Sequence, residues 1–484
     1  MRLAVSCLAL TLYAQNGGVV SVKSFGARGD GLTDDYDALQ AAATYICGHP
    51  GKTLLFPAGT YRIGRYRITG GRDANTVRNI RYTECKNVTI RGVGAKIDVK
   101  GDFRRSADSA AGAAPQSYRN GVIPFEMVNS SDFVIEGFEL NGNVDRMSRD
   151  SGVGEGSNAG ILTTNCSRYT IQDVYVHHFP TDGITLGGNS EIADRDAVVR
   201  RVIAAHNARQ GLSIIQVRGA TVSGSTFKLT GRTDGAYGNH APSAGVDVEP
   251  VRAPPEEDLK TGAILFDDCR FEDNLGIQFV SGWPDKVDRV TVQNSRVAAS
   301  RPDGEICAFL NVAGHAVNRG NIFDLAAPHA VYLGLITPPL YRYIERLEYW
   351  NNHFTLGFNG GIRSAVEQAP VDFIGNTVEV RPAGRDTSTM QLDYLNRVEG
   401  NRFFIAASGW SGRHDTISYE KGTASVRDNT YVTDLAGSRQ FEVRYGPGIL
   451  CGPEHFPAAA FKPIAGCHTE INRLPPRVPA SSAR

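Results

Sequence analysis

The sequence lacks the features that would point to nucleic acid, a membrane or a zinc-type metal site. Its 51 basic and 51 acidic side chains cancel, so no excess of charge favours nucleic acid or an anionic membrane as a partner. No stretch outside the first residues approaches the roughly 18 consecutive apolar residues that a membrane-spanning helix needs. No Cys-x-x-Cys pair or His–Cys cluster has the spacing of a metal site. The composition therefore gives no support to nucleic-acid-binding, membrane-spanning or zinc-binding proteins.

What the sequence does contain is a recurring phrase in which glycine is followed by an apolar, a variable and a second apolar residue. It occurs as AGILTT at 159, DGITLG at 182, QGLSII at 210, AGVDVE at 244 and LGIQFV at 275, at intervals of 23 to 34 residues. Alternation of period two is typical of a strand with one buried face, and recurrence at such intervals is typical of a solenoid. Because like rungs align into columns, we expect the variable residues to face outward one above another: Thr185, Ser213, Asp247 and Gln278.

The N-terminal region has a pattern of its own. In FGARGDGLTDDYDALQAAATYI, residues 38–46 follow helical apolar spacing, and LLFPAGTYRI begins the first strands. This combination resembles the opening of the pectate-lyase-like superfamily, and the resemblance implies an all-β fold, a right-handed parallel β-helix with an N-terminal capping α-helix. Members of that superfamily include polysaccharide hydrolases, polysaccharide lyases, uronate epimerases and phage tailspikes, so the fold constrains the shape of the ligand more than the reaction.

We expect a single solenoid domain over residues 18–438, because a solenoid grows by adding rungs and needs no second core. Residues 1–14 are typical of a short secretion signal, which predicts a secreted or periplasmic protein. Residues 439–484 are expected to form a C-terminal segment and a disordered tail. Insertions at 101–120, 143–158 and 230–243 interrupt the rungs, and we expect them to build walls beside a binding face.

Seven cysteines lie outside the expected signal, so at least one should be unpaired. Cys451 and Cys467 close a short loop and are the expected disulfide. Cys166, Cys269 and Cys307 occur within strand-like phrases, and we expect them to fill the interior as small apolar residues.

Two carboxylates lie two residues apart in the fourth phrase. If Asp247 and Glu249 both face outward, their Cα atoms are roughly 7 Å apart. At about that separation a glycosidase uses one protonated carboxyl as general acid and the other as base for an attacking water, which is the inverting arrangement. Mutual repulsion would raise one of the two pKa values, as the acid requires. The alternative is a pair of solvated surface groups or a cation site.

Asp182 is the candidate for a third catalytic carboxylate. It lies two rungs before Asp247, roughly 10 Å away along the stack, and strict alternation turns it inward unless the strand breaks before Gly183. TDGI resembles the NTDG motif of polygalacturonases, in which the aspartate takes part in catalysis. Pro180 replaces the asparagine of that motif, and neither Gly-His-Gly nor Arg-Ile-Lys occurs. Galacturonan hydrolysis by the machinery of that family is therefore not expected.

Other residues near these phrases are candidates for substrate binding: His178, His206, Arg209, His240, Gln278 and Trp283. Each histidine stands five residues before a strand glycine, which predicts a column of imidazoles that could shuttle protons or bind sugar hydroxyls; turn histidines are the alternative. Arg209 suits a uronate carboxylate, although it can equally pair with Asp182 or Asp247. Trp283 suits stacking on a sugar face, or it is a packed turn residue.

The function predicted from this face is cleavage of a polysaccharide by a secreted enzyme. Hydrolysis by paired carboxylates is favoured over β-elimination because the face carries more acids than bases, and it requires no cofactor. If the acids instead gather a calcium ion, the same face suits a polysaccharide lyase or a uronate C5-epimerase with a histidine or Arg209 as base. A non-catalytic carbohydrate-binding or adhesion β-helix is the third alternative.

Overall fold

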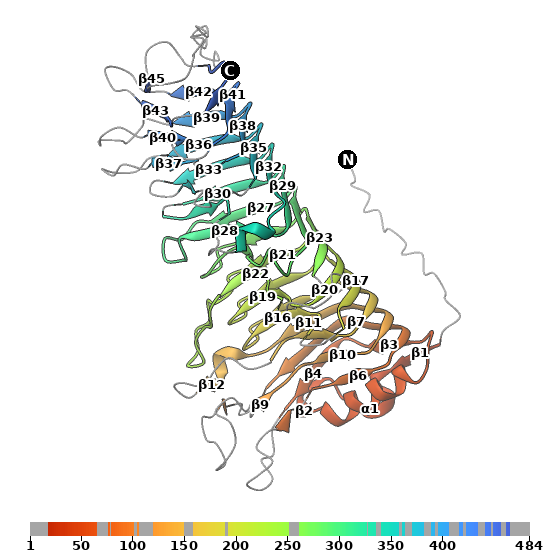
Figure 1. Ribbon diagram of the computed structural model, residues 1–484. Helices are drawn as coiled ribbons and strands as arrows, with labels where there is room; N and C mark the ends of the chain where they lie inside the picture. The colour runs from red at the N-terminus through yellow and green to blue at the C-terminus, as the bar shows by residue number, and fades with distance from the viewer. Residues whose placement is uncertain are drawn as a thin grey trace, which may run out of the picture.

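In the computed structural model the chain forms one long stack of parallel strands (Figure 1). The structure describes residues 18–464, apart from residues 65–75, 78, 101–103, 106–119, 150–157, 189–191, 251–260, 327, 335–339, 358–360, 364–369, 382–388, 393–394, 406–415, 420–422, 434–440, 447–448 and 456–460. The predicted all-β parallel β-helix with an N-terminal helix is confirmed. The predicted signal, residues 1–14, lies outside the described residues.

One side of the stack is a sheet of 14 strands, which contains the recurring glycine phrases. From the N-terminal end its strands are β6 (Arg81–Thr83), β10 (Phe125–Val128), β13 (Ile161–Thr164), β16 (Asp182–Leu186), β19 (Gln210–Ile214), β22 (Ala244–Val248), β25 (Phe279–Ser281), β28 (Cys307–Asn311), β31 (Ala330–Tyr332), β34 (Ile362–Arg363), β37 (Thr389–Gln391), β40 (Thr416–Tyr419), β43 (Phe441–Tyr445) and β45 (Phe461–Ile464).

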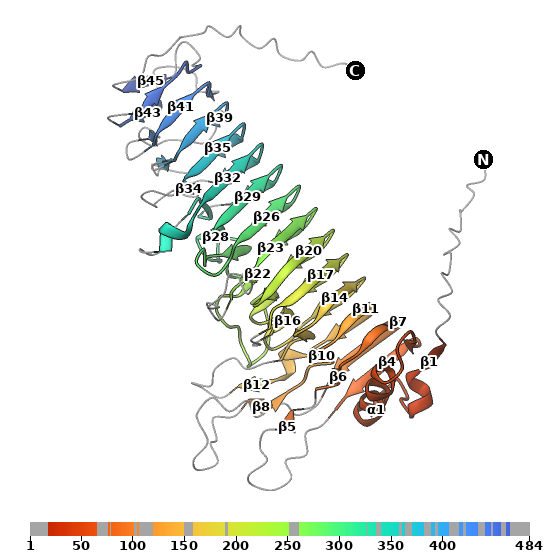
Figure 2. The ribbon, with the colours of Figure 1, turned by 45° about the vertical axis from the view of Figure 1, so that its right-hand side comes forward.

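The other sides belong to a sheet of 27 strands that divides into two columns (Figure 2). The first column contains β1 (Val19–Ser21), β3 (Thr53–Phe56), β14 (Ser167–Gln172), β17 (Asp194–Arg200), β20 (Val217–Ser223), β23 (Gly262–Asp267), β26 (Arg289–Gln293), β29 (His315–Arg319), β32 (Arg346–Trp350), β35 (Val371–Ile374), β38 (Arg397–Glu399), β41 (Ser425–Arg427) and β44 (Leu450–Cys451). The second contains β2 (Asp30–Asp34), β4 (Gly59–Ile63), β15 (Tyr175–His177), β18 (Ile203–Ala205), β21 (Thr226–Lys228), β24 (Arg270–Glu272), β27 (Arg296–Ala299), β30 (Ile322–Leu325), β33 (His353–Gly357), β36 (Thr377–Arg381), β39 (Arg402–Ile405) and β42 (Thr430–Thr433). The long strands β7 (Lys86–Val99) and β11 (Ser131–Asn141) take part in both columns, so the sheet turns a corner.

That corner explains the Asn and Asp residues that follow many strands. The first residue of each two-residue corner takes a left-handed backbone, as at Asn351 (φ 53°) and Asp428 (φ 57°), which suits short polar side chains. The second residue is buried and bonds to its neighbours along the stack. We call the row of these buried second corner residues the asparagine ladder. Its members are Asn321, Asn352, Asn376, Asn401 and Asn429.

Loss of one ladder side chain should destabilise the stack. Asn401 accepts a bond from the backbone N–H of Asn376 (2.8 Å) and donates to the carbonyl of Phe373 (2.8 Å). In Asn401→Ala both backbone groups lose their buried partner, so the free energy of unfolding should fall by about 3 kcal/mol. Denaturant unfolding measures this. Arg402→Ala is the control, since Arg402 is exposed and its change should alter stability little.

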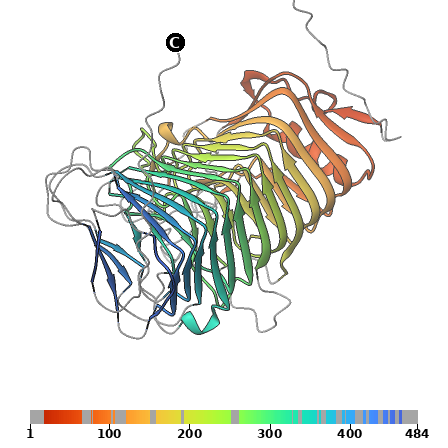
Figure 3. The same cartoon turned by 90° about the horizontal axis from the view of Figure 1, so that it is seen from above.

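The interior of the stack is apolar and is filled by the inward-facing side chains of the strands. Phenylalanines from successive rungs contact one another there, with ring centroids 5.1 Å apart for Phe309 and Phe323 and 4.5 Å apart for Phe323 and Phe354. Seen along the stack, the rungs surround this common interior (Figure 3). Burial of such rings supplies most of the favourable free energy of a solenoid, whose repeats contact only their neighbours.

The N-terminal end of the core is covered by helix α1 (Tyr36–Cys47), whose buried residues include Leu39 and Ile46. A disulfide joins Cys47 at its end to Cys85, just before β7. The sequence did not predict this bond, because the two residues are 38 positions apart and only the fold brings them together. Cys451 is also disulfide-bonded, and its predicted partner, Cys467, lies outside the described residues.

The three cysteines expected in the interior are free; Cys166 and Cys269 are buried and Cys307 is partly buried. The stack also continues past residue 438, because β43, β44 and β45 pair with the preceding rungs. The rung pattern is hard to recognise there because the strands are short and irregularly spaced. No helix in the described part of the chain is long and apolar enough to cross a membrane.

Candidate active site

The outward column of the 14-stranded sheet is centred on Asp247. Thr185 pairs with Ser213, and Ser213 pairs with Asp247, so three of the four predicted members lie in adjacent rungs. The next member is Val280, not Gln278. The prediction for Gln278 was wrong by two residues because strand β25 begins three residues after Gly276 rather than directly after it. Gln278 instead closes a buried turn by bonding to Asn274 (2.9 Å and 3.1 Å).

Three carboxylates gather on this face, and we call Asp182, Asp247 and Glu249 the carboxylate cluster. Arg209 lies between two of them, with Nη2 2.7 Å from Oε1 of Glu249 and Nη1 3.4 Å from both carboxylate oxygens of Asp182. Gln210 Nε2 donates to Oδ2 of Asp247 (2.9 Å) and to Oε1 of Glu249 (3.0 Å). The structure therefore brings together all three acids that the sequence singled out, and adds Gln210, which it did not.

Asp182 reaches this face although it has the same parity as the inward-facing Ile184. Its Oδ2 accepts a hydrogen bond from the hydroxyl of Thr185 at 2.9 Å, and Thr185 belongs to the outward column. Gln210 occupies the paired position one rung above and also turns toward the outward acids. The first residue of these strands thus departs from strict alternation although strand β16 already begins at Asp182, so no break before Gly183 is needed.

Oε1 of Glu249 accepts three hydrogen bonds. Besides Arg209 and Gln210, the hydroxyl of Ser213 donates to it at 3.1 Å. No donor from the described residues reaches the second oxygen, Oε2, and the side chain is 23% exposed. The three donors hold this oxygen in place, and one of them is the guanidinium of Arg209. Glu249 therefore has one oxygen fixed by its neighbours and one oxygen left for a ligand or water.

Asp247 has the opposite character. It is 7% exposed and has no cationic partner in hydrogen-bond contact among the described residues. Burial raises the pKa of its carboxyl well above the usual range, the negative charge of Glu249 raises the pKa further, and Arg209 opposes this in part. A carboxyl whose pKa is raised by burial beside a second acid is the environment in which a general acid is found.

The raised pKa makes a prediction about stability. An acid whose folded-state pKa lies above its unfolded value binds more protons when folded, so its burial destabilises the fold increasingly as pH rises above about 4. Asp247→Asn removes this ionisation, and we expect the variant to be more thermostable than the wild type at neutral and higher pH. The difference should vanish near pH 3.5, where both side chains are neutral. Thermal midpoints measured from pH 3.5 to 9 test this; a constant difference would contradict it.

A calcium ion does not fit the carboxylate cluster as these side chains stand. The guanidinium of Arg209 bonds to two of the three acids, and Gln210 occupies one oxygen of the third. The positive charge that would balance the acids thus comes from the chain itself. Within the described residues, no group of three or more His, Cys, Asp or Glu side chains is arranged to hold a metal ion.

Two of the three candidate histidines form a stacked pair. The rings of His178 and His206 lie 4.9 Å apart and 11° from parallel, and both residues have a left-handed backbone at the corner after their strands. Burial lowers the pKa of His178, although nearby Asp145 opposes the change. Nε2 of His178 lies 3.4 Å from Oδ2 of Asp145.

His240 does not continue this pair. Its backbone N–H bonds to the carbonyl of Ala208 and its ring lies 6.0 Å from Tyr237. The predicted equivalence fails because residues 230–243 are inserted between β21 and β22, so the count back from Gly245 has no structural meaning. His177, which the sequence did not single out, joins the pair instead, with its Nδ1 2.6 Å from Nδ1 of His178. Burial, and next the neighbouring His178, lowers the pKa of His177 to about 4.

Trp283 lies two residues beyond β25, whose Ser281 pairs with Val248, while Glu249 is the first residue beyond β22. The indole is 43% exposed, and the ammonium of Lys286 lies 4.7 Å from its ring centroid. An exposed aromatic ring near the acids is suited to stacking on a sugar.

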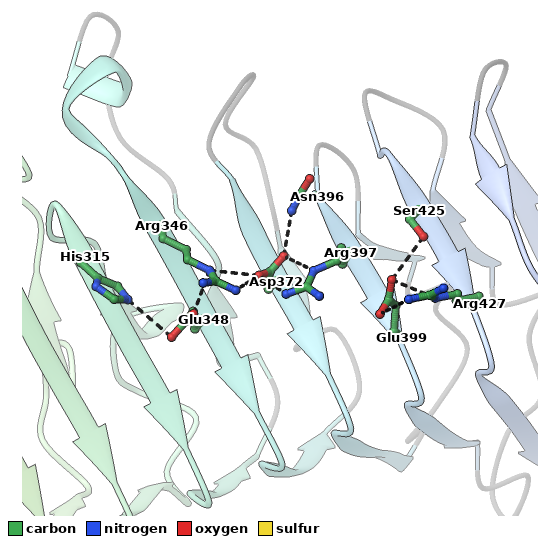
Figure 4. A network of polar contacts seen from close by, with 9 residues as sticks. All are labelled: His315, Arg346, Glu348, Asp372, Asn396, Arg397, Glu399, Ser425 and Arg427. Atoms are coloured by element: carbon green, nitrogen blue, oxygen red, sulfur yellow. Dashed lines mark hydrogen bonds and ion pairs between the residues drawn. The ribbon is translucent and has the colours of Figure 1, made fainter.

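A second polar network follows the first column of the long sheet, outside the 14-stranded sheet (Figure 4). Asp372 is 1% exposed and accepts hydrogen bonds from Arg346, Arg397 and Asn396. Burial raises the pKa of Asp372, but these donors outweigh it and hold the pKa below its usual range. Because the acid is saturated by its own neighbours, this network holds rungs together and does not resemble a reactive site.

Comparison with known proteins agrees with this architecture. The family described as "Rhamnogalacturonase A/epimerase, pectate lyase-like" matches residues 19–68, which contain α1 and the first strands. This match and the parallel strands of the structure confirm the predicted likeness to the pectate-lyase-like superfamily of parallel β-helices. The sequence is 46% identical over 55 residues to alginate lyase 7 of Azotobacter vinelandii, covering 11% of this chain and 6% of that protein.

Two other known proteins match longer segments of the chain. A mannuronan C5-epimerase of A. vinelandii is 27% identical over 224 residues, which is 41% of this chain and 11% of that protein. An α-1,3-galactosidase A of Shewanella woodyi is 26% identical over 132 residues, 26% of this chain and 19% of that protein. The chain thus spans a small fraction of the length of each relative it matches.

Solved β-helix structures of low sequence identity also match. A tailspike protein of an E. coli bacteriophage, in complex with a pentasaccharide, has a TM-score of 0.48 and 14% identity, with 92% of this chain and 78% of that chain covered. The A-module of an A. vinelandii mannuronan C-5 epimerase has a TM-score of 0.37 and 14% identity, with 90% and 99% covered.

Proposed function

We propose that this β-helix is a polysaccharide hydrolase whose active centre is the carboxylate cluster. The observation that carries the proposal is the contrast between two adjacent acids: Asp247 is buried and its pKa is raised, whereas Glu249 is partly exposed and paired with Arg209. Support also comes from the curated relatives, whose names describe enzymes acting on polysaccharides or glycosides.

In the proposed reaction, Asp247 is the general acid and donates its proton to the glycosidic oxygen as the bond to the anomeric carbon breaks. Glu249, through Oε2, takes a proton from the water that attacks the anomeric carbon. One water is consumed per bond cleaved, and the proton balance is restored when Asp247 regains a proton from solvent and Glu249 releases one. Asp182 holds Arg209, and Arg209 in turn holds Oε1 of Glu249.

The remaining candidates are assigned to substrate binding. Trp283 provides an exposed aromatic ring just beyond β25, the strand that follows β22 in the sheet, and the stacked pair of His178 and His206 offers imidazole nitrogens to sugar hydroxyls. Arg209 is committed to two carboxylates, so we assign it to the acids and not to a uronate of the substrate. We also propose, from residues 1–14, that the enzyme acts outside the cytoplasm.

A lyase or C5-epimerase is the second candidate, favoured by the matches to an alginate lyase and a mannuronan C5-epimerase. The test is release of reducing ends from plant, algal and bacterial polysaccharides, with absorbance of unsaturated uronate followed in the same samples, with and without a chelator. Hydrolysis predicts reducing ends without that absorbance, in the presence of the chelator as well. Absorbing products that disappear with the chelator would instead assign the lyase. Binding without cleavage would exclude the hydrolase and the lyase, and a change in the uronate composition of the intact polymer would then separate a C5-epimerase from an adhesion protein.

A further inference from the structure

Gln210 connects the two acids of the proposed mechanism, and neither the sequence pattern nor the family resemblance points to it. It is the first residue of β19, is 0% exposed, and lies one rung from β22. Its single amide nitrogen bonds to both Asp247 Oδ2 and Glu249 Oε1, at 2.9 Å and 3.0 Å. A primary amide nitrogen carries two hydrogens, so each acid receives one of them.

The neighbouring charges fix the orientation of this amide. If its oxygen and nitrogen were exchanged, the carbonyl oxygen would face Oε1 of Glu249, which is ion-paired to Arg209 and can only accept. The observed orientation leaves Oε1 of Gln210 buried without a donor among the described residues. Buried polar groups are rarely left unpaired away from functional sites. The bonds to the two acids therefore determine how the amide lies, at the expense of its own carbonyl.

We propose that Gln210 is a positioning residue that selects which oxygen of each acid reacts. It occupies Oδ2 of Asp247, which leaves the transferable proton on Oδ1, and it occupies Oε1 of Glu249, which leaves Oε2 for the water. No donor from the described residues reaches Oδ1 of Asp247. This inference rests on the proposed hydrolase function, in which these two acids are the general acid and the base.

Gln210→Met tests the proposal, since methionine has nearly the same length and shape but no N–H. An N–H donor favours the charged form of a carboxylate, so its loss should move the ionisation of both acids to higher pH. We expect both limbs of the pH profile of kcat/KM to move to higher pH. We also expect kcat to fall about 100-fold while KM changes less than about twofold. The carboxyl groups of Asp247 and Glu249 are then no longer held in position for proton transfer, whereas the contacts that bind the substrate remain.

Two further variants separate positioning from packing. Gln216→Met makes the same change in a glutamine that is 5% exposed, lies two residues beyond β19, and forms no side-chain hydrogen bond with another described residue. Its pH profile should match that of the wild type. Gln210→Glu restores the shape and regains an O–H donor only when protonated, so it should recover activity at acidic pH alone.

The inference can also be tested without turnover. The carboxyl signal of Asp247, followed by ¹³C NMR and assigned by its loss in Asp247→Asn, should titrate at higher pH in Gln210→Met than in the wild type. If the wild type cleaves no polysaccharide, the proposed function fails while this titration still tests the coupling. If Gln210→Met is folded and both its titration and its pH profile coincide with those of the wild type, the positioning role is wrong.

Discussion

Asp247→Asn and Glu249→Gln are each expected to lower kcat for polysaccharide hydrolysis by about 10³-fold. Asparagine cannot give the glycosidic oxygen a proton, and glutamine cannot take one from the attacking water, so each variant loses one half of the acid–base pair. KM should change little, because both replacements keep the shape of the side chain. Initial rates of reducing-end release measure the effect.

The control for this pair is Asp196→Asn. Asp196 is exposed on β17, outside the 14-stranded sheet, and its left-handed backbone (φ 55°) accommodates asparagine. It should retain wild-type activity. The two active-site changes should also be strongly non-additive when combined, since they disable one step. An Asp247→Asn enzyme with a wild-type kcat would place the acid elsewhere.

Arg209→Met is expected to lower the free energy of unfolding by about 3 to 5 kcal/mol at neutral pH. The guanidinium side chain is 16% exposed and neutralises Glu249 and Asp182, which are 23% and 6% exposed. Removing one partner of a largely buried ion pair leaves uncompensated charge, which is what makes such changes severe. Denaturant unfolding at neutral pH measures the loss.

Arg201→Met provides the matched comparison. Arg201 also forms a bidentate pair, with Asp173, but these side chains are 53% and 47% exposed. Exposed pairs contribute little, so the loss there should stay below about 1 kcal/mol at every pH. Equal losses in the two variants would show that Arg209 does not neutralise buried acids.

The fold could be predicted from the sequence because a solenoid repeats the same physical requirement in each rung. Alternation in phrases such as QGLSII fixes which face is buried, and the residues of each corner fix where the chain turns. Features that depend on distant rungs could not be predicted. The Cys47–Cys85 bond joins residues that no local pattern relates, and the last rungs, such as β45, have too little periodicity to stand out.

The site was predictable to the extent that register could be counted. Asp247 and Glu249 follow from alternation, which continues one residue past the end of β22. Ser213 follows because it lies two residues after the glycine of its phrase, as Asp247 does. Counting failed where rungs differ in length, which misplaced Gln278 and His240. Gln210 was missed because alternation assigns the first residue of its strand to the interior, while its bonds to the acids turn it outward.

The masses of the reaction products test the central claim most directly. A hydrolase adds one water across each bond it cleaves, so the account predicts saturated oligosaccharides from the wild type and none above background from Asp247→Asn. Two results would contradict it: products with an unsaturated end, formed by cleavage without the addition of water, or cleavage by Asp247→Asn at the wild-type rate.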